Sequence, residues 1–388
     1  MTFTVNGSPL TERYLAKSLF KTDGNLYAWG NNSYAQLGIE NLTLDRKLSP
    51  IQVGVLSNWA SVASNLNSST EGSIASTFII KTDGTLWGCG YNTYGQLGLF
   101  DTIRRSSFVQ VGTQSNWSQV SFGYIHAAII KTDGTLWTCG YNYAGQLGLS
   151  DTVNRSSPVQ VGTQSNWAQI ACGYDFSTAI KTDGTLWTCG YGDNGQLGNN
   201  TTTGPLGQTL IFYQVGTLNN WSKVSNNGRG SLSIKTDSTL WSWGQNNFGQ
   251  LGLSDTDNRS SPVQIGTLSN WSVNISSAWF YNAAIKADGT LWTWGNNSFG
   301  QLGLSNRTHR SSPVQVGTAS NWSKVSCGGT HMAALKTDGT LWTCGYNRWG
   351  QLGLSNITNR SVLIQVGALN QWSQISAGTV MTFGIDIV

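Results

Sequence analysis

The side chains of this chain best suited to chemistry are three histidines and six cysteines. Histidine can act as a general base, and cysteine can act as a nucleophile or metal ligand. They are His126, His309, His331, Cys89, Cys139, Cys172, Cys189, Cys327 and Cys344. No Cys-x-x-Cys pair or matching histidine spacing occurs, and no Ser/His/Asp order or paired-carboxylate site can be assembled around the histidines. We therefore expect no catalytic residue, no metal site and no cofactor, and no enzymatic activity.

An internal repeat accounts for these residues. The phrase K-T-D-G-T-L-W-T-C-G-Y-N-x-x-G-Q-L-G begins at Lys21, Lys81, Lys131, Lys181, Lys235, Lys286 and Lys336. A period of 50 to 60 residues is typical of a propeller, solenoid or array. Four of the cysteines share a repeat position with Trp29, Trp243 and Trp294, and His126 and His331 share one with Phe176, Gly230, Tyr281 and Met381. Both positions are predicted to pack in the interior.

Each repeat unit predicts four short antiparallel strands. In the unit that begins at Asn116, we place them at residues 117–121, 126–132, 135–141 and 158–161. Asp133-Gly134 predicts a two-residue type I′ hairpin between the second and third strands. Those two strands are apolar on both faces, so each sheet must lie between two others. Leucines of the Gly-Gln-Leu-Gly turns, such as Leu147, are expected to fill the gaps between sheets.

Seven such units predict an all-β, seven-bladed β-propeller of four-stranded antiparallel blades. The last unit supplies first and second strands and then stops, while the N-terminal segment supplies a third and a fourth. We expect a composite blade from both termini to close the ring. Leu15–Phe20 and Val380–Ile387 both fit its second strand. The predicted domains are an arm at residues 1–13 and the propeller at 14–388, and the sequence does not say where the arm docks.

The charge and hydropathy of the chain limit the classes of partner that it is expected to bind. Charged residues make up 10% of the chain, the net charge is +4, and no block of like charges exists. We expect no nucleic acid partner. The N-terminus lacks the pattern of a signal peptide and no long apolar stretch occurs, so we expect no membrane partner. The protein is expected in the cytoplasm or assembled into a particle; the organism and the oligomeric state stay open.

The repeat resembles the regulator of chromosome condensation repeat family. The marks are Gly-x-x-His before the second strand (Gly123 to His126), the Asp-Gly hairpin, Cys-Gly-Tyr-Asn after the third strand, and Gly-Gln-Leu-Gly. The resemblance implies a seven-bladed propeller. Known members include a nucleotide-exchange factor for a small nuclear GTPase with a basic tail, inhibitors of β-lactamase, and interaction modules of larger proteins. This chain has no basic tail, and its nearest wedge-like insertion, Asn65 to Ser76, carries Glu71 as its only charge.

Two series of charged residues follow the repeat. The hairpin lysines, such as Lys131, are expected to pair with the aspartate of their own turn, such as Asp133. The second series precedes the fourth strand, on the rim opposite the Asp-Gly turns: Arg105, Arg155, Arg259, Arg310 and Arg360, with Lys47 in the matching position. These cations are either solvated loop residues or a ring that engages an anionic partner.

Positions where the repeats disagree are the best candidates for function, because loops on a rigid scaffold carry binding residues. The loops before the second strand and after the third strand should open on the same face. The predicted partner-binding residues there are aromatic: Tyr124, Tyr174, Trp279, Phe280, Tyr94, Tyr143, Phe248, Phe299 and Trp349. Aromatic clusters of this kind are typical of binding hot spots. The alternative is that the rings only pack between adjacent loops.

We therefore predict a non-catalytic recognition module that binds a protein or a glycan through this face, as part of a larger assembly or alone. Two alternatives stay open. One is a guanine-nucleotide exchange factor for a small GTPase, and the other is a structural protein of a phage or viral particle. The sequence does not identify the partner.

Overall fold

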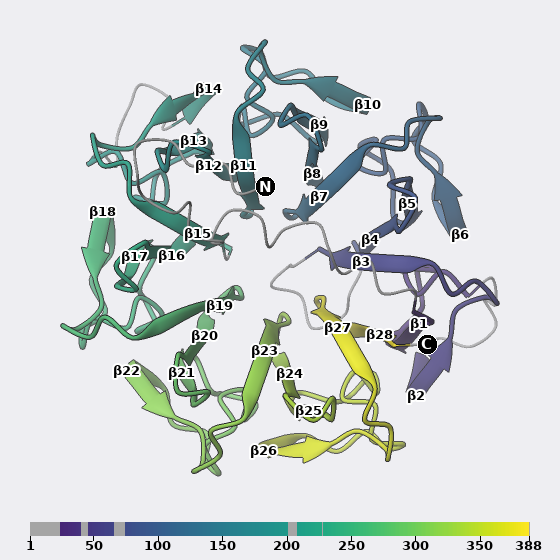
Figure 1. The fold of residues 1–388 in the computed structure, drawn as a ribbon, viewed down its shortest axis with the longest axis vertical. Coiled ribbons are helices and arrows are strands. Elements are labelled where there is room, and N and C mark those ends of the chain that lie inside the picture. The colour runs from purple at the N-terminus through teal and green to yellow at the C-terminus, as the bar shows by residue number, and fades with distance from the viewer. Residues whose placement is uncertain (1–23, 40–45, 66–73, 201–207, 227, 388) are drawn as a thin grey trace, which may run out of the picture.

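A computed structural model describes residues 24–39, 46–65, 74–200, 208–226 and 228–387. Seven four-stranded antiparallel sheets are arranged around a central axis (Figure 1). The predicted seven-bladed β-propeller is therefore confirmed. The predicted arm at residues 1–13 and Leu15–Phe20 lie outside the described residues. In the described part of the chain, no helix is long and apolar enough to cross a lipid bilayer.

The same residue opens the equivalent strand of nearly every blade. First strands all begin at the repeated tryptophan: β3 Trp59–Ser64, β7 Trp117–Phe122, β11 Trp167–Cys172, β15 Trp221–Asn226, β19 Trp271–Ser277, β23 Trp322–Cys327 and β27 Trp372–Ala377. Six of the second strands end at the repeated lysine: β4 Ser76–Lys81, β8 His126–Lys131, β12 Phe176–Lys181, β16 Gly230–Lys235, β20 Tyr281–Lys286, β24 His331–Lys336, with β28 Met381–Asp386 as the seventh.

Third strands begin at the repeated leucine: β5 Leu86–Gly90, β9 Leu136–Gly140, β13 Leu186–Tyr191, β17 Leu240–Gly244, β21 Leu291–Gly295, β25 Leu341–Gly345 and β1 Leu26–Asn31. Fourth strands form the outer rim: β6 Arg105–Gln110, β10 Arg155–Gln160, β14 Gln208–Gln214, β18 Arg259–Gln264, β22 Arg310–Gln315, β26 Arg360–Gln365 and β2 Arg46–Gln52. The fourth strand thus begins at Arg155, three residues before the predicted start. We number the blades 1 to 7 from β3–β6 to the closing blade β27, β28, β1 and β2.

The second strands are buried along their whole length, as the apolar pattern predicts. Each apolar cluster joins neighbouring blades: Phe78 of β4 packs with Phe122 and Ile129 of blade 2, and its ring stacks on Phe122 at 4.7 Å. The turn leucines are buried as expected, and Leu97 belongs to the same cluster. A single blade has too little core of its own, so its strands are stable only between two neighbours.

The hairpin between the second and third strands differs from the predicted type I′ turn. Gly134 donates its N–H to Lys131 O, Lys131 pairs with Thr135, and Gly134 has φ of 79° while Asp133 does not have positive φ. This is a three-residue loop whose glycine forms a bulge. Asp133 is selected for its side chain instead, because its Oδ1 accepts hydrogen bonds from the N–H and hydroxyl of Thr135.

Lys131 does not form the expected contact-range ion pair with its turn aspartate Asp133, whereas Arg105, Arg155 and Arg259 each form such a pair with an aspartate. Instead Lys131 Nζ lies 4.9 Å from the ring centre of Trp117 and 3.9 Å from that of Trp137. The five equivalent lysines do the same. Burial lowers the pKa of Lys131, while nearby Asp133 raises it. A cation held between two indoles fastens the inner strand to the third strand of the blade.

The position shared by cysteine and tryptophan is more than an apolar packing position. In all seven blades its side chain donates a hydrogen bond to the carbonyl of the Gly-Gln-Leu-Gly glutamine in the preceding blade. Cys139 Sγ lies 3.6 Å from Gln96 O, and Trp243 Nε1 lies 3.0 Å from Gln196 O. The other pairs are Cys89–Gln36, Cys189–Gln146, Trp294–Gln250, Cys344–Gln301 and Trp29–Gln351. Cysteine and tryptophan are interchangeable here because each combines an apolar body with a donor.

The ring closes as predicted, with one blade made from both ends of the chain. The second strand of this blade is β28, which pairs with β27 on one side and β1 on the other. Asp386 occupies the position that the lysine holds in other blades. Its carboxylate accepts a hydrogen bond from the N–H of Asn25 at 2.8 Å. In this blade the second and third strands are not joined by a hairpin, because they come from opposite ends of the chain. The contact between Asn25 and Asp386 connects them where the other blades have a turn.

Ring closure makes β28 a determinant of stability. Phe383 is fully buried in the core between the closing blade and blade 1. We expect Phe383→Ala to lower the free energy of unfolding by about 3–5 kcal/mol, because it leaves a cavity in a closely packed core. Ile387→Ala, one residue beyond β28 at a side chain that is 46% exposed, should cost about 0.5 kcal/mol or less. Urea unfolding monitored by tryptophan fluorescence checks both, and equal losses would contradict the role of β28.

The two repeat histidines are interior residues, as expected. His126 Nε2 lies 3.0 Å from Ser177 Oγ and His331 Nε2 lies 2.8 Å from Thr382 Oγ1, each in the following blade. Burial lowers the pKa of both imidazoles from 6.5 to about 3. Between these values the unfolded chain binds protons that the folded chain does not. Folding stability must therefore fall as the pH drops below 6.5.

We expect each buried histidine to contribute a loss of about 1.4 kcal/mol per pH unit between pH 6.5 and 4.5. His126→Met/His331→Met, which copies Met381 of the closing blade, should flatten this slope by roughly 3 kcal/mol per pH unit. His309→Asn is the control, because His309 is exposed and blades 2, 4 and 6 have asparagine there. Urea unfolding at several pH values measures the slopes; a double variant with the wild-type slope would refute the assignment.

Candidate functional site

The loops after the first strand and after the third strand open on one face of the ring, which we call the loop face. Their positions follow from strand pairing: the start of the second strand at His126 and the start of the fourth at Arg155 both lie opposite Gly140, the end of the third strand. The hairpins and the connections between blades lie on the other face, which we call the hairpin face. All nine predicted aromatic residues belong to loops of the loop face.

Aromatic rings from blades 2, 3 and 5 meet on this face. Tyr124 and Tyr174 stack with ring centres 4.3 Å apart, and Tyr174 meets Trp279 edge-on at 4.8 Å. The indole of Trp279 reaches Tyr174 across the loop of blade 4 because that loop has a glycine at the crossing point. A Cβ on Gly228 would lie 2.5 Å from the indole. Gly228 O also accepts the N–H of Tyr174 at 2.8 Å. The glycine of one blade thus lets the aromatic residues of two others touch.

The chain of rings continues outward. Trp279 lies 5.8 Å from Phe280, Phe280 meets Phe248 at 4.9 Å, and Phe248 meets His309 at 5.7 Å. Five of the predicted residues therefore form one connected group, which we call the aromatic arc: Tyr124, Tyr174, Trp279, Phe280 and Phe248. Trp279 is only 6% exposed, so it supports the arc from below, while the other four are partly exposed.

The remaining predicted aromatic residues lie in separate groups. Tyr94 and Tyr143 are joined through Tyr141, at 5.0 Å and 6.3 Å. Tyr143 is the most open of the set at 72% exposure. Phe299 packs on Tyr346 of the next blade at 4.7 Å, and Trp349 lies under the Arg348 guanidinium at 5.7 Å. Packing between loops and exposure thus coexist in this set, and partner binding stays a prediction.

Asp175 is a partly buried carboxyl group beside the aromatic arc, and it is absent from the predicted set. Burial raises its pKa to about 6, which the nearby Arg229 guanidinium partly opposes. Burial is the main cause of the raised pKa values of Tyr124 and Tyr141, and the hydrogen bond to Asp193 is that of Tyr191; the charge of Asp175 adds to all three. Asp175 and Arg229 occupy loop positions where the repeats disagree, so disagreement alone could have identified them. A titratable group with a shifted pKa beside exposed rings is a candidate recognition determinant.

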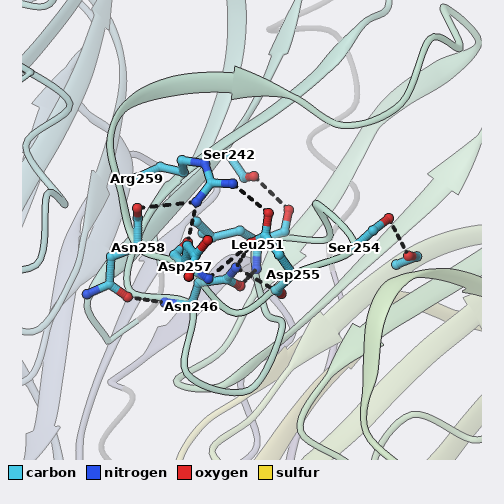
Figure 2. Close-up of polar contacts among 9 residues, drawn as sticks. Ser242, Asn246, Leu251, Ser254, Asp255, Asp257, Asn258 and Arg259 are labelled. Carbon is cyan, nitrogen blue, oxygen red and sulfur yellow. Dashed lines mark hydrogen bonds and ion pairs between the residues drawn. The ribbon is translucent and has the colours of Figure 1, made fainter.

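Six of the seven loops after a third strand are organised by one asparagine, and blade 3 has Gly192 in its place. In blade 4, Asn246 Oδ1 accepts the N–H of Leu251, and its Nδ2 donates to the main-chain oxygen and Oδ1 of Asp255 (Figure 2). Arg259 then binds Asp255 Oδ2 at 2.5 Å. Arg105–Asp101 and Arg155–Asp151 repeat the pair in blades 1 and 2. The predicted ring of arginines is therefore neutralised from within in three blades.

The insertion Asn65 to Ser76 lies mainly at residues 66–73, outside the described residues. Its first residue is placed: Asn65 Nδ2 donates to Tyr124 O at 3.0 Å. The described end of the insertion is thus anchored next to the aromatic arc.

Comparison with known proteins gives a consistent result. A family model described as an RCC1-like domain matches residues 75–384, and one described as the regulator of chromosome condensation (RCC1) repeat matches residues 23–64. Among curated proteins, the ultraviolet-B receptor UVR8 of Arabidopsis thaliana is 35% identical over 113 residues, 28% of this chain and 26% of that protein. Human protein RCC2 is 40% identical over 102 residues, 25% of this chain and 19% of that protein. The matched segments thus span about a quarter or less of these relatives.

Solved structures agree with the fold. Yeast RCC1 (Prp20), solved bound to Kap60, has a TM-score of 0.85 at 18% identity and covers 97% of this chain and 91% of its own. Human WBSCR16 has a TM-score of 0.80 at 21% identity, with 94% and 98% covered. At these identities the likeness concerns the fold alone.

The shifted pKa of Asp175 gives a test of the site. The folded protein holds a proton on this carboxyl group between pH 3.8 and 6, where the unfolded chain releases it. The ionised carboxylate therefore destabilises the fold at neutral pH. Asp175→Asn should raise the free energy of unfolding at pH 7 by about 1–3 kcal/mol, with the gain disappearing near pH 4.

Asp193→Asn is the matched control, because Asp193 lies in the neighbouring loop of the same blade and is exposed. Urea unfolding at pH 4 and pH 7 compares the variants. A loss of stability in Asp175→Asn at pH 7 would show that the ionised carboxylate is stabilising and the assignment wrong.

Proposed function

The chain belongs to the RCC1-like domain family, and we propose that it is a non-catalytic recognition propeller that binds a partner through the loop face. The observation that carries the proposal is the joining of aromatic residues from blades 2 to 5 into the aromatic arc, with Tyr143 exposed on the same face. These residues occupy loop positions where seven otherwise similar repeats differ. The rest of each repeat forms and stabilises the propeller.

Physical chemistry favours such a surface for binding. Tyrosine and tryptophan supply large contact areas at a small cost in conformational entropy, and they retain a polar group for hydrogen bonding. Mutual packing within the arc fixes ring orientations before a partner arrives, which reduces the entropy lost on binding. In this arrangement Trp279 acts as a support, while Tyr143, Tyr94 and Trp349 provide contacts. This refines the prediction that all nine residues touch the partner.

A protein is the class of partner that we favour. Yeast RCC1, which shares the fold, is solved in complex with another protein, Kap60. The loop face is a broad surface of partly exposed rings, as in protein–protein hot spots. A glycan stays the alternative ligand, and assembly into a larger particle is a form of the same proposal.

The absence of catalysis is also part of the proposal. The six cysteines are buried, and burial raises the pKa of thiols such as Cys172, to about 12, so they stay protonated. His126 and His331 are buried with their Nε2 atoms engaged by the next blade. The groups that first pointed to chemistry thus have contacts that serve the fold.

Site-specific photocrosslinking tests the face. A benzophenone amino acid at position 143, on the loop face, should give a covalent adduct with the partner in cells that make the protein. The same amino acid at Leu218, exposed at 47% on the hairpin face, should give none. Gel shift and mass spectrometry of the adducts provide the measurement. Adducts from position 218 alone, or from both in equal yield, would refute recognition through the loop face.

A further inference from the structure

The rim arginines fall into two groups that differ in a single loop residue. In blades 1, 2 and 4 the arginine that opens the fourth strand binds an aspartate four residues earlier, as Arg259 binds Asp255 at 2.5 Å (Figure 2). In blades 5 and 6 the same loop position holds Asn306 and Asn356, four residues before Arg310 and Arg360. No carboxylate is therefore present in the loop for these two arginines.

The replacement leaves the loop unchanged. Asn306 Oδ1 accepts the N–H of Thr308 at 3.0 Å, just as Asp255 Oδ1 accepts that of Asp257 at 3.0 Å. The main-chain oxygen of Asn306 accepts Asn297 Nδ2 at 2.9 Å, as that of Asp255 accepts Asn246 Nδ2. Asn356 repeats both contacts in blade 6. The negative charge is lost while the hydrogen bonds within the loop are kept.

The two arginines are thus left without a carboxylate among the described residues. Arg310 donates only a long bond of 3.4 Å to His309 O, and Arg360 Nε is buried without a hydrogen-bond partner. The side chain amides cannot take over, because Asn306 Nδ2 and Asn356 Nδ2 are themselves donors, to Leu304 O and Leu354 O. In blades 5 and 6 an uncharged amide therefore stands where blade 4 has the carboxylate that binds its arginine.

More cations surround these positions. Arg307 and Arg348 are exposed in the same loops, and Arg46 Nη1 donates to Arg348 O at 2.9 Å across the boundary with the closing blade. From residue 258 to residue 385 the acidic residues are Asp288 and Asp338, both in turns of the hairpin face. The described loop face of blades 5 and 6 therefore carries positive charge alone.

Contacts between blades make these cations one surface. The N–H of Ser305 in the blade 5 loop donates to Ser361 O, next to Arg360, at 2.8 Å. The N–H of Ser355 in the blade 6 loop donates to Leu48 O, next to Lys47, at 2.9 Å. Arg360 also lines a groove of about 440 Å³ between blade 6 and the closing blade, with Pro50, Leu354 and Ile364 as apolar neighbours. We call this surface the cationic rim.

We propose that the cationic rim binds carboxylates of an acidic segment of a partner protein, with Arg310 and Arg360 as the principal ligands. The inference rests on the proposed function, because it names the chemistry of the partner on the same face. A carboxylate is favoured over a phosphate because three sister loops fill the equivalent position with an aspartate carboxylate. Charge-assisted hydrogen bonds from an arginine guanidinium group are strong and directional. A small number of them is therefore enough to set the register of the bound segment.

The repeat itself provides the variant that tests this. Asn306→Asp/Asn356→Asp should restore the internal ion pairs and occupy both arginines, without removing any arginine. We expect fluorescein-labelled decaglutamate to bind the native protein in 50 mM NaCl and to bind this variant about tenfold or more weakly by fluorescence anisotropy. Asp255→Asn, which frees Arg259, should bind more tightly than the native protein. Aspartate already stands in these loops in three blades, so the variant should fold.

Thr163→Asp/Thr318→Asp controls for net charge, because it adds two carboxylates at exposed positions of the hairpin face. It should retain most of the affinity. The proposal is wrong if native protein fails to bind decaglutamate, if the control loses as much affinity as Asn306→Asp/Asn356→Asp, or if decathymidylate binds more tightly than decaglutamate and responds to the same variants. The last result would assign the rim to nucleic acid. Crosslinking at position 143 is independent, so it can succeed while this inference fails.

Discussion

One hydrogen bond, repeated seven times, ties each blade to the one before it. A thiol or indole on the third strand donates to the glutamine carbonyl of the preceding Gly-Gln-Leu-Gly turn, from Cys89 onto Gln36 to Trp29 onto Gln351. The bond is buried, and at Gln36, Gln146, Gln250 and Gln351 the same carbonyl also accepts a hydrogen bond from the second strand of the next blade. The contact recurs at every boundary between blades, including the one before the closing blade, in which β28 pairs with β1.

This constraint explains why the loop face can vary. The residues that hold the ring together lie within the strands, the hairpins and the Gly-Gln-Leu-Gly turns. Apart from their ends, the loops that carry Tyr124, Tyr174 and Trp279 do not contain the residues that hold the ring together. Their side chains can therefore change from blade to blade, and contacts between different blades, such as that of Trp279 with Gly228, decide the shape of the surface.

The sequence predicts the fold well because every blade repeats the same information. Strand number, blade number, ring closure and the burial of cysteine and histidine all follow from comparing repeats. The errors concern contacts that the repeat pattern does not express. Asp133 resembles a type I′ turn residue in sequence, but it serves as an acceptor for Thr135. Lys131 is adjacent to an aspartate in the chain, yet it lies between two indoles that come from other strands.

The candidate site shows the same limit. The aromatic positions are visible in the sequence, but the burial of Trp279 and the shifted pKa of Asp175 depend on which loops meet in space. In the cationic rim, by contrast, the charge differs between blades while the structure of the loops does not. Its loops keep one geometry whether aspartate or asparagine is present, so a single substitution changes the electrostatics of a blade without disturbing its structure. A scaffold fixed by internal bonds between blades can therefore distribute different chemistry around one face. Aromatic contacts lie over blades 2 to 5, and arginines without a carboxylate partner among the described residues lie over blades 5 and 6.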